Sequence, residues 1–218
     1  MKKLSSIIAL LAVGCGGSAT PNCKSGDPYE RYLGAVTLGS TGDKNDAYQA
    51  CRLIQDPDPL ARDGAVIAMG EIGDPGNVPR VAATLKLSCP VHPELLADVP
   101  GICAKCGKRP LERAVPNNAM VRTDAVRALA RLGGGEAQAS VLVALAKDES
   151  VDVRRTAAHV AAKFGSNRAV LEALVEAMGD PSAGVVYAAH GALVALTKQD
   201  KTAREKLAWR AWLDAQPK

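Results

Sequence analysis

The chain has 218 residues with 47% hydrophobic and 3% aromatic side chains, and its 27 lysines and arginines against 23 acidic residues give a formal net charge of +4. If residues 1–14 are removed as a short basic leader, Lys2 and Lys3 are removed with them. The remaining chain has 25 basic and 23 acidic residues, a net charge of +2. So small a charge provides no strong field to recruit nucleic acid, and we therefore exclude nucleic acid from the expected partners.

The first fourteen residues have the pattern of an export signal. Lys2 and Lys3 give a basic start, and the apolar run that follows is too short to span a bilayer. The run ends at Ala12-Val13-Gly14-Cys15, which resembles a bacterial lipobox. This resemblance implies lipidation of Cys15 and an exported protein anchored to a membrane, on the periplasmic side of the outer membrane. The alternative is an ordinary secretory signal that is cut nearby; in either case residues 15–26 form a linker.

From Gly26 onward the sequence repeats itself with a period of 31 to 32 residues. The anchor positions lie at intervals of 31, 60, 32 and 32 residues: Gly39, Gly70, Ala130, Ala162 and Val194. Subtracting residues 88–116, which number 29, reduces the second interval to 31. We therefore interpret residues 27–87 as two repeats, 88–116 as an insertion, and 117–218 as three further repeats.

Each repeat is expected to contain two helices, because apolar residues such as Val121, Ala125 and Leu129 recur at helical spacing. Aspartate–proline pairs are expected to begin first helices at Asp27-Pro28, Asp58-Pro59 and Asp180-Pro181. Glycines are expected to end them at Gly42, Gly73, Gly133 and Gly165. Second helices are predicted near residues 43–55, 77–87, 136–147, 167–178 and 201–214. The predicted fold class is therefore all-α, an α-solenoid of about five helical-hairpin repeats.

A recurring pattern of small residues, carried best by Val121-Arg122, Val153-Arg154 and Ala157-Ala158, resembles the HEAT-like repeats of the bilin-lyase type. The resemblance implies a stack of helices whose surface binds a protein partner. Trp209 and Trp212, three residues apart on the last helix, are expected to cover the end of the stack. The alternative is an exposed aromatic pair for docking.

One short segment has the spacing of a four-ligand metal site. Two residues separate Cys89 from His92 and Cys103 from Cys106, and ten residues separate the two pairs. Three thiolates and one imidazole favour tetrahedral Zn²⁺ or another soft divalent or heavy-metal ion, and four protein ligands indicate a closed site.

Residues 87–111 resemble the small heavy-metal-binding domain of exported metal-efflux components and some metal-transporting ATPases. The matching positions are Cys89, Pro90, His92, Pro93, Pro100, Gly101, Cys103, Cys106 and Gly107. Val91 and Lys108 stand where that family has methionines, and Ala104 replaces a proline. Because thioether sulfur is the ligand that best selects Cu(I), these departures weaken a role in copper delivery.

Two alternatives remain for this segment. Cys103 and Cys106 could form an exposed redox disulfide with Cys89 free, although no thioredoxin-like βαβ pattern accompanies them. The metal could also merely fold the insertion, which we weigh equally with a transport role, because the free energy of metal binding in a small loop is folding free energy.

Cys23 and Cys51 are the two cysteines left after lipid and metal, and they are candidates for a disulfide between the linker and the first repeat in an oxidising compartment. His159 and His190 stand at different positions of their repeats, so we expect them to be ordinary packing or surface residues.

The sequence therefore predicts an exported, membrane-anchored scaffold that binds a protein partner and carries one structural zinc-type site. The alternative is a protein that binds, senses or delivers heavy metal in connection with metal efflux. An enzyme is not expected, because a site with four protein ligands leaves no open coordination position for water or substrate.

Overall fold

The computed structural model describes residues 22–43, 45–46, 50, 52–85, 87–88, 96–97, 118–199 and 203–217. The first helices of the first three repeats begin where a polar side chain accepts a hydrogen bond from a free amide of the first turn. The caps are Asp27 for α1 (Pro28–Thr41), Asp58 for α3 (Pro59–Ile72) and Asn118 for α5 (Ala119–Leu132). α7 (Val151–Ala161), extended by η4 (Ala162–Phe164), and α9 (Ala183–Thr197) are the corresponding helices of the last two repeats.

The four predicted glycine stops are confirmed. The backbone has positive φ angles of 70° at Gly42, 71° at Gly73, 72° at Gly133 and 85° at Gly165. A glycine reaches this region without the steric cost that a Cβ atom imposes, so it ends each helix cleanly.

Second helices follow each first helix, close to the predicted ranges. The first repeat ends in η1 (Leu53–Gln55), and the second has η2 (Pro75–Asn77) followed by the six-residue α4 (Val78–Ala83). The others are α6 (Gly135–Lys147), α8 (Arg168–Ala177) and α10 (Lys206–Asp214). α4 is shorter than the predicted 77–87, because the chain turns at Thr84 and Leu85 toward the insertion.

One predicted helix start is wrong. Asp180-Pro181 was expected to open a helix, but α9 begins at Ala183, with Ser182 as its N-cap residue. The Asp180 carboxylate accepts from the Ser182 amide at 2.8 Å and also binds Arg154, so it shapes the turn before the helix. Asp180 therefore resembles Asp56, which precedes the true cap Asp58 and accepts from its amide at 2.9 Å.

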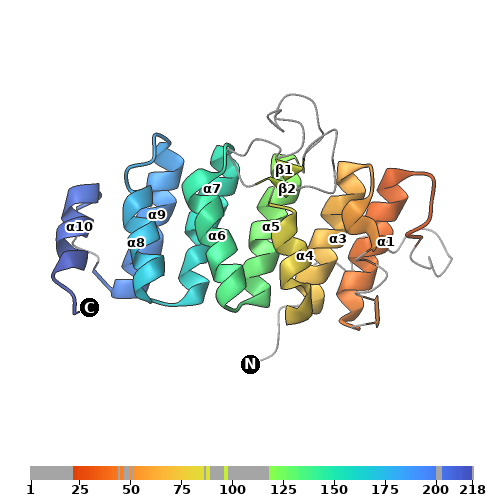
Figure 1. Cartoon of the computed structure of the whole chain (residues 1–218), viewed down its shortest axis with the longest axis horizontal. Helices are drawn as coiled ribbons and strands as arrows, with labels where there is room; N and C mark the ends of the chain where they lie inside the picture. Colours follow the sequence, from red (N-terminus) through yellow and green to blue (C-terminus); the bar gives the residue numbers. More distant parts are fainter. Residues whose placement is uncertain are drawn as a thin grey trace, which may run out of the picture.

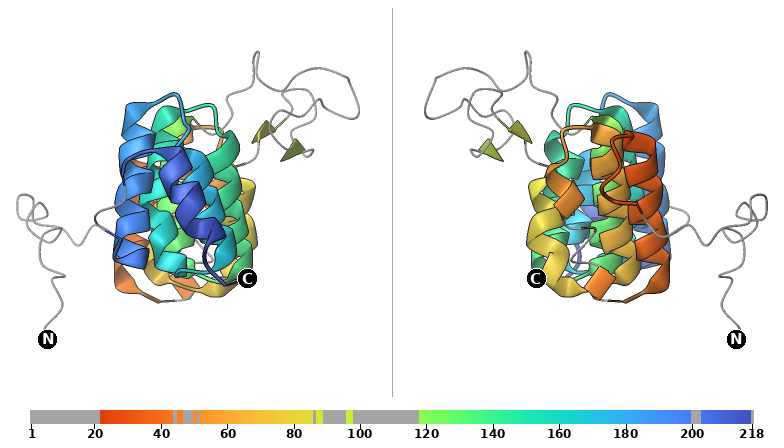
Figure 2. Two further views of the ribbon diagram at one scale, coloured as in Figure 1. Left: turned by 90° about the vertical axis from the view of Figure 1, so that its left-hand side faces the viewer. Right: turned by 90° about the vertical axis from the view of Figure 1, so that its right-hand side faces the viewer.

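The helices stack in two layers to form an all-α solenoid (Figure 1). Each first helix packs against the next, in the order α1, α3, α5, α7, α9, and α4, α6, α8 and α10 form the second layer beside them. The end-on views in Figure 2 show the two layers side by side along the length of the stack. We refer to these as the first-helix layer and the second-helix layer.

Small residues let the first helices approach one another closely. A Cβ atom added to Gly39 of α1 would lie 2.6 Å from the Cα of Ala68 in α3, and one added to Gly70 of α3 would lie 2.8 Å from the Cβ of Ala128 in α5. Contacts this short cannot be relieved by a side-chain rotation, because backbone atoms make them. The glycine and alanine content of the repeats therefore sets the spacing of the layer.

The main hydrophobic core runs without a break from Val66 of α3 to Leu213 of α10. Trp209 is completely buried in it, Trp212 is partly buried, and their rings meet edge to face at 5.7 Å. The prediction that these tryptophans cover the end of the stack is confirmed. His190 packs edge-on against Trp209 at 5.7 Å, whereas His159 is exposed on α7.

A short strand pair, which the sequence did not predict, leaves the stack between α4 and α5. β1 (Leu87–Ser88) pairs antiparallel with β2 (Leu96–Ala97), with Leu87 opposite Ala97 and Ser88 opposite Leu96. Apart from Leu87, which ends the predicted second repeat, the pair falls inside the predicted insertion, where the repeat period is broken.

The close packing generates a prediction for two matched glycines, each inside a first helix. Gly70→Ala should lower the free energy of unfolding by about 1–3 kcal/mol, because the new methyl group overpacks the contact with Ala128. Gly191→Ala, on α9 with open space around its Cα, should raise it by about 0.5–1 kcal/mol through helix propensity. Urea unfolding of both variants checks this; equal effects of the two substitutions would refute the packing argument.

Candidate functional site

All four predicted metal ligands, Cys89, His92, Cys103 and Cys106, lie outside the residues that the structure describes. The described neighbours place the segment: Cys89 follows Ser88 of β1, and Ser88 pairs with Leu96, so Cys89 and His92 belong to the seven residues that join two paired strands. Among the described residues there is no group of three or more potential metal ligands. The zinc-type site stays a prediction.

Cys15 and Cys51 also lie outside the described residues, whereas Cys23 is described and half-buried. Cys23 packs against a small satellite core made of Ala35, Leu53 and Ala65. Burial raises the pKa of its thiol, and the negative charge of Asp46 raises it further. The thiol of Cys23 is free in the structure, and its predicted disulfide with Cys51, which lies outside the described residues, stays a prediction.

For the predicted lipid anchor the structure supplies one related fact. Within the described part of the chain, no helix has both the length and the apolar character needed to cross a bilayer.

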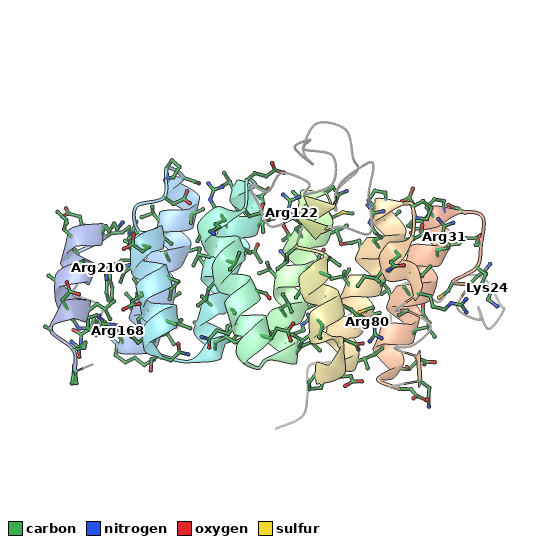
Figure 3. All side chains as sticks on the ribbon, in the orientation of Figure 1. Lys24, Arg31, Arg80, Arg122, Arg168 and Arg210 are labelled. Carbon is green, nitrogen blue, oxygen red and sulfur yellow. The ribbon has the colours of Figure 1, made fainter. Side chains whose placement is uncertain are left out.

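The most regular arrangement of charged side chains is a series of arginine–aspartate bridges between repeats. The guanidinium of Arg31 in α1 binds both carboxylate oxygens of Asp56, at 2.8 Å each. Arg122 in α5 binds Asp148 in the same two-pronged way at 2.9 Å, and Arg154 in α7 binds Asp180 at 2.8 and 3.1 Å. We call this series the arginine ladder; Figure 3 shows its members Arg31 and Arg122 at the same edge of the stack.

Arg31 and Arg154 also hold the loop that precedes their own helix. Arg31 donates to the carbonyl oxygens of Ser25 and Gly26 at 2.8 and 3.1 Å, which are six and five residues before it. Arg154 donates to the carbonyl oxygens of Asp148 and Glu149 at 2.8 and 3.0 Å, again six and five residues before it. One guanidinium therefore ties the loop before its repeat to the loop after it.

Two aspartates of the ladder, Asp56 and Asp180, have lowered pKa values. Burial alone would raise the pKa of Asp56, but hydrogen bonds from Arg31 and the Asp58 amide, with the charges of Arg31 and Arg62, lower it. The pKa of Asp180 is lowered mainly by its hydrogen bond from Arg154, against the opposing effect of burial. A lowered carboxyl pKa stabilises the fold at pH values above the unfolded pKa, and this contribution is lost as the pH falls through the folded pKa.

Arg62 of α3 occupies the ladder position of the second repeat. It donates to the carbonyl oxygens of Asp56 and Pro57 at 2.6 and 3.0 Å, as two other ladder arginines do with their preceding loops. The aspartates of the ladder lie 25 or 26 residues after their arginines, and residue 88, which is 26 after Arg62, is a serine in β1. The insertion thus begins where this repeat would otherwise supply its aspartate.

Sequence reasoning singled out Val121-Arg122 and Val153-Arg154 as a family pattern but missed the aspartates they bind. The signal was present: an aspartate recurs 25 or 26 residues after Arg31, Arg122 and Arg154. In this spacing, each aspartate stands in the loop between one repeat and the next.

A second candidate surface is the side of the first-helix layer that faces away from other helices. Each inner member of that layer has a neighbour on both sides and the second-helix layer behind it, so its remaining exposed residues point to the open side. Large apolar side chains are exposed at both ends: Tyr29 (55%) and Leu33 (44%) of α1, and Tyr187 (65%) of α9. Tyr29 stacks on Tyr32 at 6.3 Å, and the Arg204 guanidinium lies 4.9 Å from the Tyr187 ring centroid.

The middle of this open face is charged. Arg127 pairs with Asp124 at 2.5 Å, Arg155 pairs with Asp152 at 2.8 Å, and Arg131 of α5 reaches Glu71 of α3. Exposed residues also include His159 of α7 and Lys163 of η4. The open face therefore combines aromatic ends with a centre of paired charges.

The second half of the chain is similar in sequence to a known repeat family. A family model described as HEAT repeats matches residues 110–194 and 139–214. Among solved structures, the complex of CpcE and CpcF of phycocyanin lyase from Nostoc sp. PCC7120 is similar over 95% of this chain and 92% of that chain, at 14% sequence identity and a TM-score of 0.46. Human deoxyhypusine hydroxylase is similar over 88% of this chain and 81% of that chain, at 19% identity and a TM-score of 0.30. No curated protein sequence matches.

The ladder yields a prediction on two adjacent arginines. Arg154→Leu should lower the free energy of unfolding by about 3 kcal/mol at neutral pH, because Asp180, 9% exposed, is left buried without its cation. Arg155→Leu removes only an exposed pair with Asp152 and should cost less than about 1 kcal/mol.

Because the pKa of Asp180 is lowered by Arg154, the deficit of Arg154→Leu should shrink as the pH falls below the unfolded carboxyl pKa. Denaturant unfolding at pH 7 and at pH 3 measures both effects. A deficit that is equal for the two arginines, or independent of pH, would contradict the ladder's role.

Proposed function

We propose that this chain of HEAT-type repeats is an exported, membrane-anchored scaffold that binds a protein partner through the open face of its first-helix layer and carries a structural zinc-type site in its insertion. The observation that carries the proposal is the extent of that face. It runs from α1 to α9 and presents exposed tyrosine, leucine and arginine side chains along its length.

The composition of the open face supports binding to protein. Tyrosine and arginine are the residues that most often dominate the energy of protein interfaces, and here both are exposed on rigid helices. Because the layer is held by backbone contacts at Gly39 and Gly70, the face is pre-organised and binding would cost little ordering entropy. Stacked repeats commonly bind their partners over such extended surfaces.

Photo-crosslinking from single exposed positions tests this role. A photoreactive amino acid at Tyr187 or Leu33, both exposed on the end members of the first-helix layer, should give discrete protein adducts in native membranes. The matched control is Val143, 56% exposed on α6 of the second-helix layer, from which far fewer adducts are expected. Equal yields from the two layers would refute the assignment of the binding face.

The metal proposal rests on the ligand set in the sequence. Cys89, His92, Cys103 and Cys106 would supply three thiolates and one imidazole, a donor set typical of closed structural zinc sites. We assign no catalytic role to this site, because four protein ligands complete the coordination of a tetrahedral ion and leave no position for water or substrate. The alternative, heavy-metal handling, is favoured by the resemblance of residues 87–111 to heavy-metal-binding domains.

Elemental analysis of the purified chain should give one zinc ion per molecule, and Cys103→Ser/Cys106→Ser should abolish it. Chelation should leave most of the helical circular dichroism unchanged, because the repeats on both sides of the insertion pack without it. An unchanged metal content in the double variant would refute the ligand assignment. Rapid exchange of the metal with a chelator at native fold would favour metal handling over a structural role.

Two further cysteine assignments belong to the proposal. Cys15 would carry the lipid anchor, and Cys23 would bond to Cys51, so that the linker is tied to the first repeat. The mass of the detergent-extracted protein reports both. A mature chain beginning at Cys15 should carry added acyl mass, and a tryptic peptide pair linked through Cys23 should disappear on reduction.

A further inference from the structure

Asp63 is a buried carboxyl group in the middle of a helix–helix contact. It lies in α3, which packs between α1 and α5, and it is only 3% exposed. Its Oδ1 atom is buried and accepts no hydrogen bond. A carboxylate in such surroundings is costly unless it is paired or carries a proton.

The neighbour of Asp63 across the helix boundary is a second acid. The charge of Asp124 and a hydrogen bond with its carboxyl group both raise the pKa of Asp63, so the two carboxyl groups lie next to each other across the boundary between α3 and α5. Two carboxyl groups can share a hydrogen bond only when one of them carries a proton. Asp124, on α5, already pairs with Arg127 at 2.5 Å and is 19% exposed, so its charge is compensated. Asp63 is the more deeply buried of the two and has no cation of its own among the described contacts, so it is the site for the proton.

Among the described residues, the other groups around Asp63 and Asp124 do not supply a full positive charge to compensate Asp63. From α1 the neighbour is Tyr32, whose pKa is raised by its burial and by the negative charges of Asp63 and Asp124. From α5 the charge of Arg127 lowers the pKa of Asp63 only in part. η1, which also packs on α3, consists of Leu53, Ile54 and Gln55 and has no titratable side chain.

Burial raises the pKa of Asp63 from 3.8 to about 7, with further contributions from the charge of Asp124 and from the hydrogen bond between the two carboxyl groups. The close contact of Gly70 of α3 with Ala128 of α5 holds the two helices together, so a like-charge repulsion between the two carboxyl groups would work against this packing. Any loss of the shared proton therefore acts on the α3–α5 contact itself.

We propose that Asp63 and Asp124 share one proton and form a pH-sensitive clasp between α3 and α5, the two first helices on either side of the insertion. With the proton in place the two halves of the solenoid are joined through a neutral contact. Without it, two negative charges face one another inside the layer, and the contact loosens at the point where the insertion leaves the stack. The clasp does not depend on the proposed binding function.

The direction of the pH effect follows from linkage. The unfolded chain releases this proton near its ordinary pKa of 3.8, and the folded chain near 7. The folded state therefore binds the proton more tightly, so its contribution to stability is complete below about pH 4, falls between about pH 4 and 7, and is absent above that range.

The test compares the full-length chain with Asp63→Asn and Asp152→Asn in urea unfolding at half-unit steps from pH 4 to pH 8.5. Asp152→Asn is the control, because Asp152 also lies on a first helix but is 66% exposed and paired with Arg155. The urea midpoint of the wild type and of Asp152→Asn should fall as the pH rises toward 7, relative to that of Asp63→Asn. Amide hydrogen exchange in α3 and α5 should increase above pH 7, after correction for the intrinsic rate, in the wild type but not in Asp63→Asn.

If Asp63→Asn fails to fold, a direct titration of the wild-type carboxyl groups tests the proposal. In the wild-type protein, carbon-13 NMR of the aspartate carboxyl groups should show one group titrating near pH 7. Titration of every aspartate below pH 5 would overturn the proposal, as would parallel pH profiles of the wild type and Asp63→Asn. Stabilisation of the wild type by millimolar calcium or magnesium chloride that Asp63→Asn abolishes would also overturn it, in favour of a bridging cation.

Discussion

Buried arginine–aspartate bridges join the first repeat of this protein to the second, the third to the fourth and the fourth to the fifth. A helical hairpin built from alanine and valine buries too little surface to be stable alone, so each repeat depends on its neighbours. The hydrophobic core supplies most of the stabilisation between repeats. Apolar contacts are not directional, however, so they do not select one position of a repeat against the next. A two-pronged bridge such as that of Arg122 to Asp148, with both side chains about 5% exposed, accepts only one geometry. It therefore fixes how far each repeat rotates against the next.

The ladder and the close glycine contacts act together. Gly39 and Gly70 bring the first helices within backbone contact, and the arginines clamp the loops at one edge of the same layer. The insertion occupies the one turn where the second repeat has Ser88 in place of a ladder aspartate. The same junction contains Asp63 and Asp124, so three unusual features of the chain meet between α3 and α5.

Much of this architecture was predictable, because it is determined by local chemistry that repeats. The period, the caps at Asp27 and Asp58 and the glycine stops followed from residue types, and the tryptophans of the last helix packed as expected. Asp180-Pro181 was misassigned because the same dipeptide serves as a helix cap in one loop and as the ladder turn in another. The contact of Asp63 with Asp124 could not be predicted, since it joins positions 61 residues apart across the insertion. For the predicted ligands Cys89, His92, Cys103 and Cys106, the described strands place only the chain on either side of the first pair.

The central claim is that the arginine ladder couples neighbouring repeats energetically, beyond the cost of losing either side chain. A double-mutant cycle on Arg154 and Asp180, with each changed to leucine alone and both together, measures that coupling directly. The account predicts an interaction free energy of about 1–3 kcal/mol at pH 7, because each single variant leaves a buried partner without its counter-charge. Additive effects within about 0.5 kcal/mol would contradict it, and the stack would then be held by its apolar contacts alone.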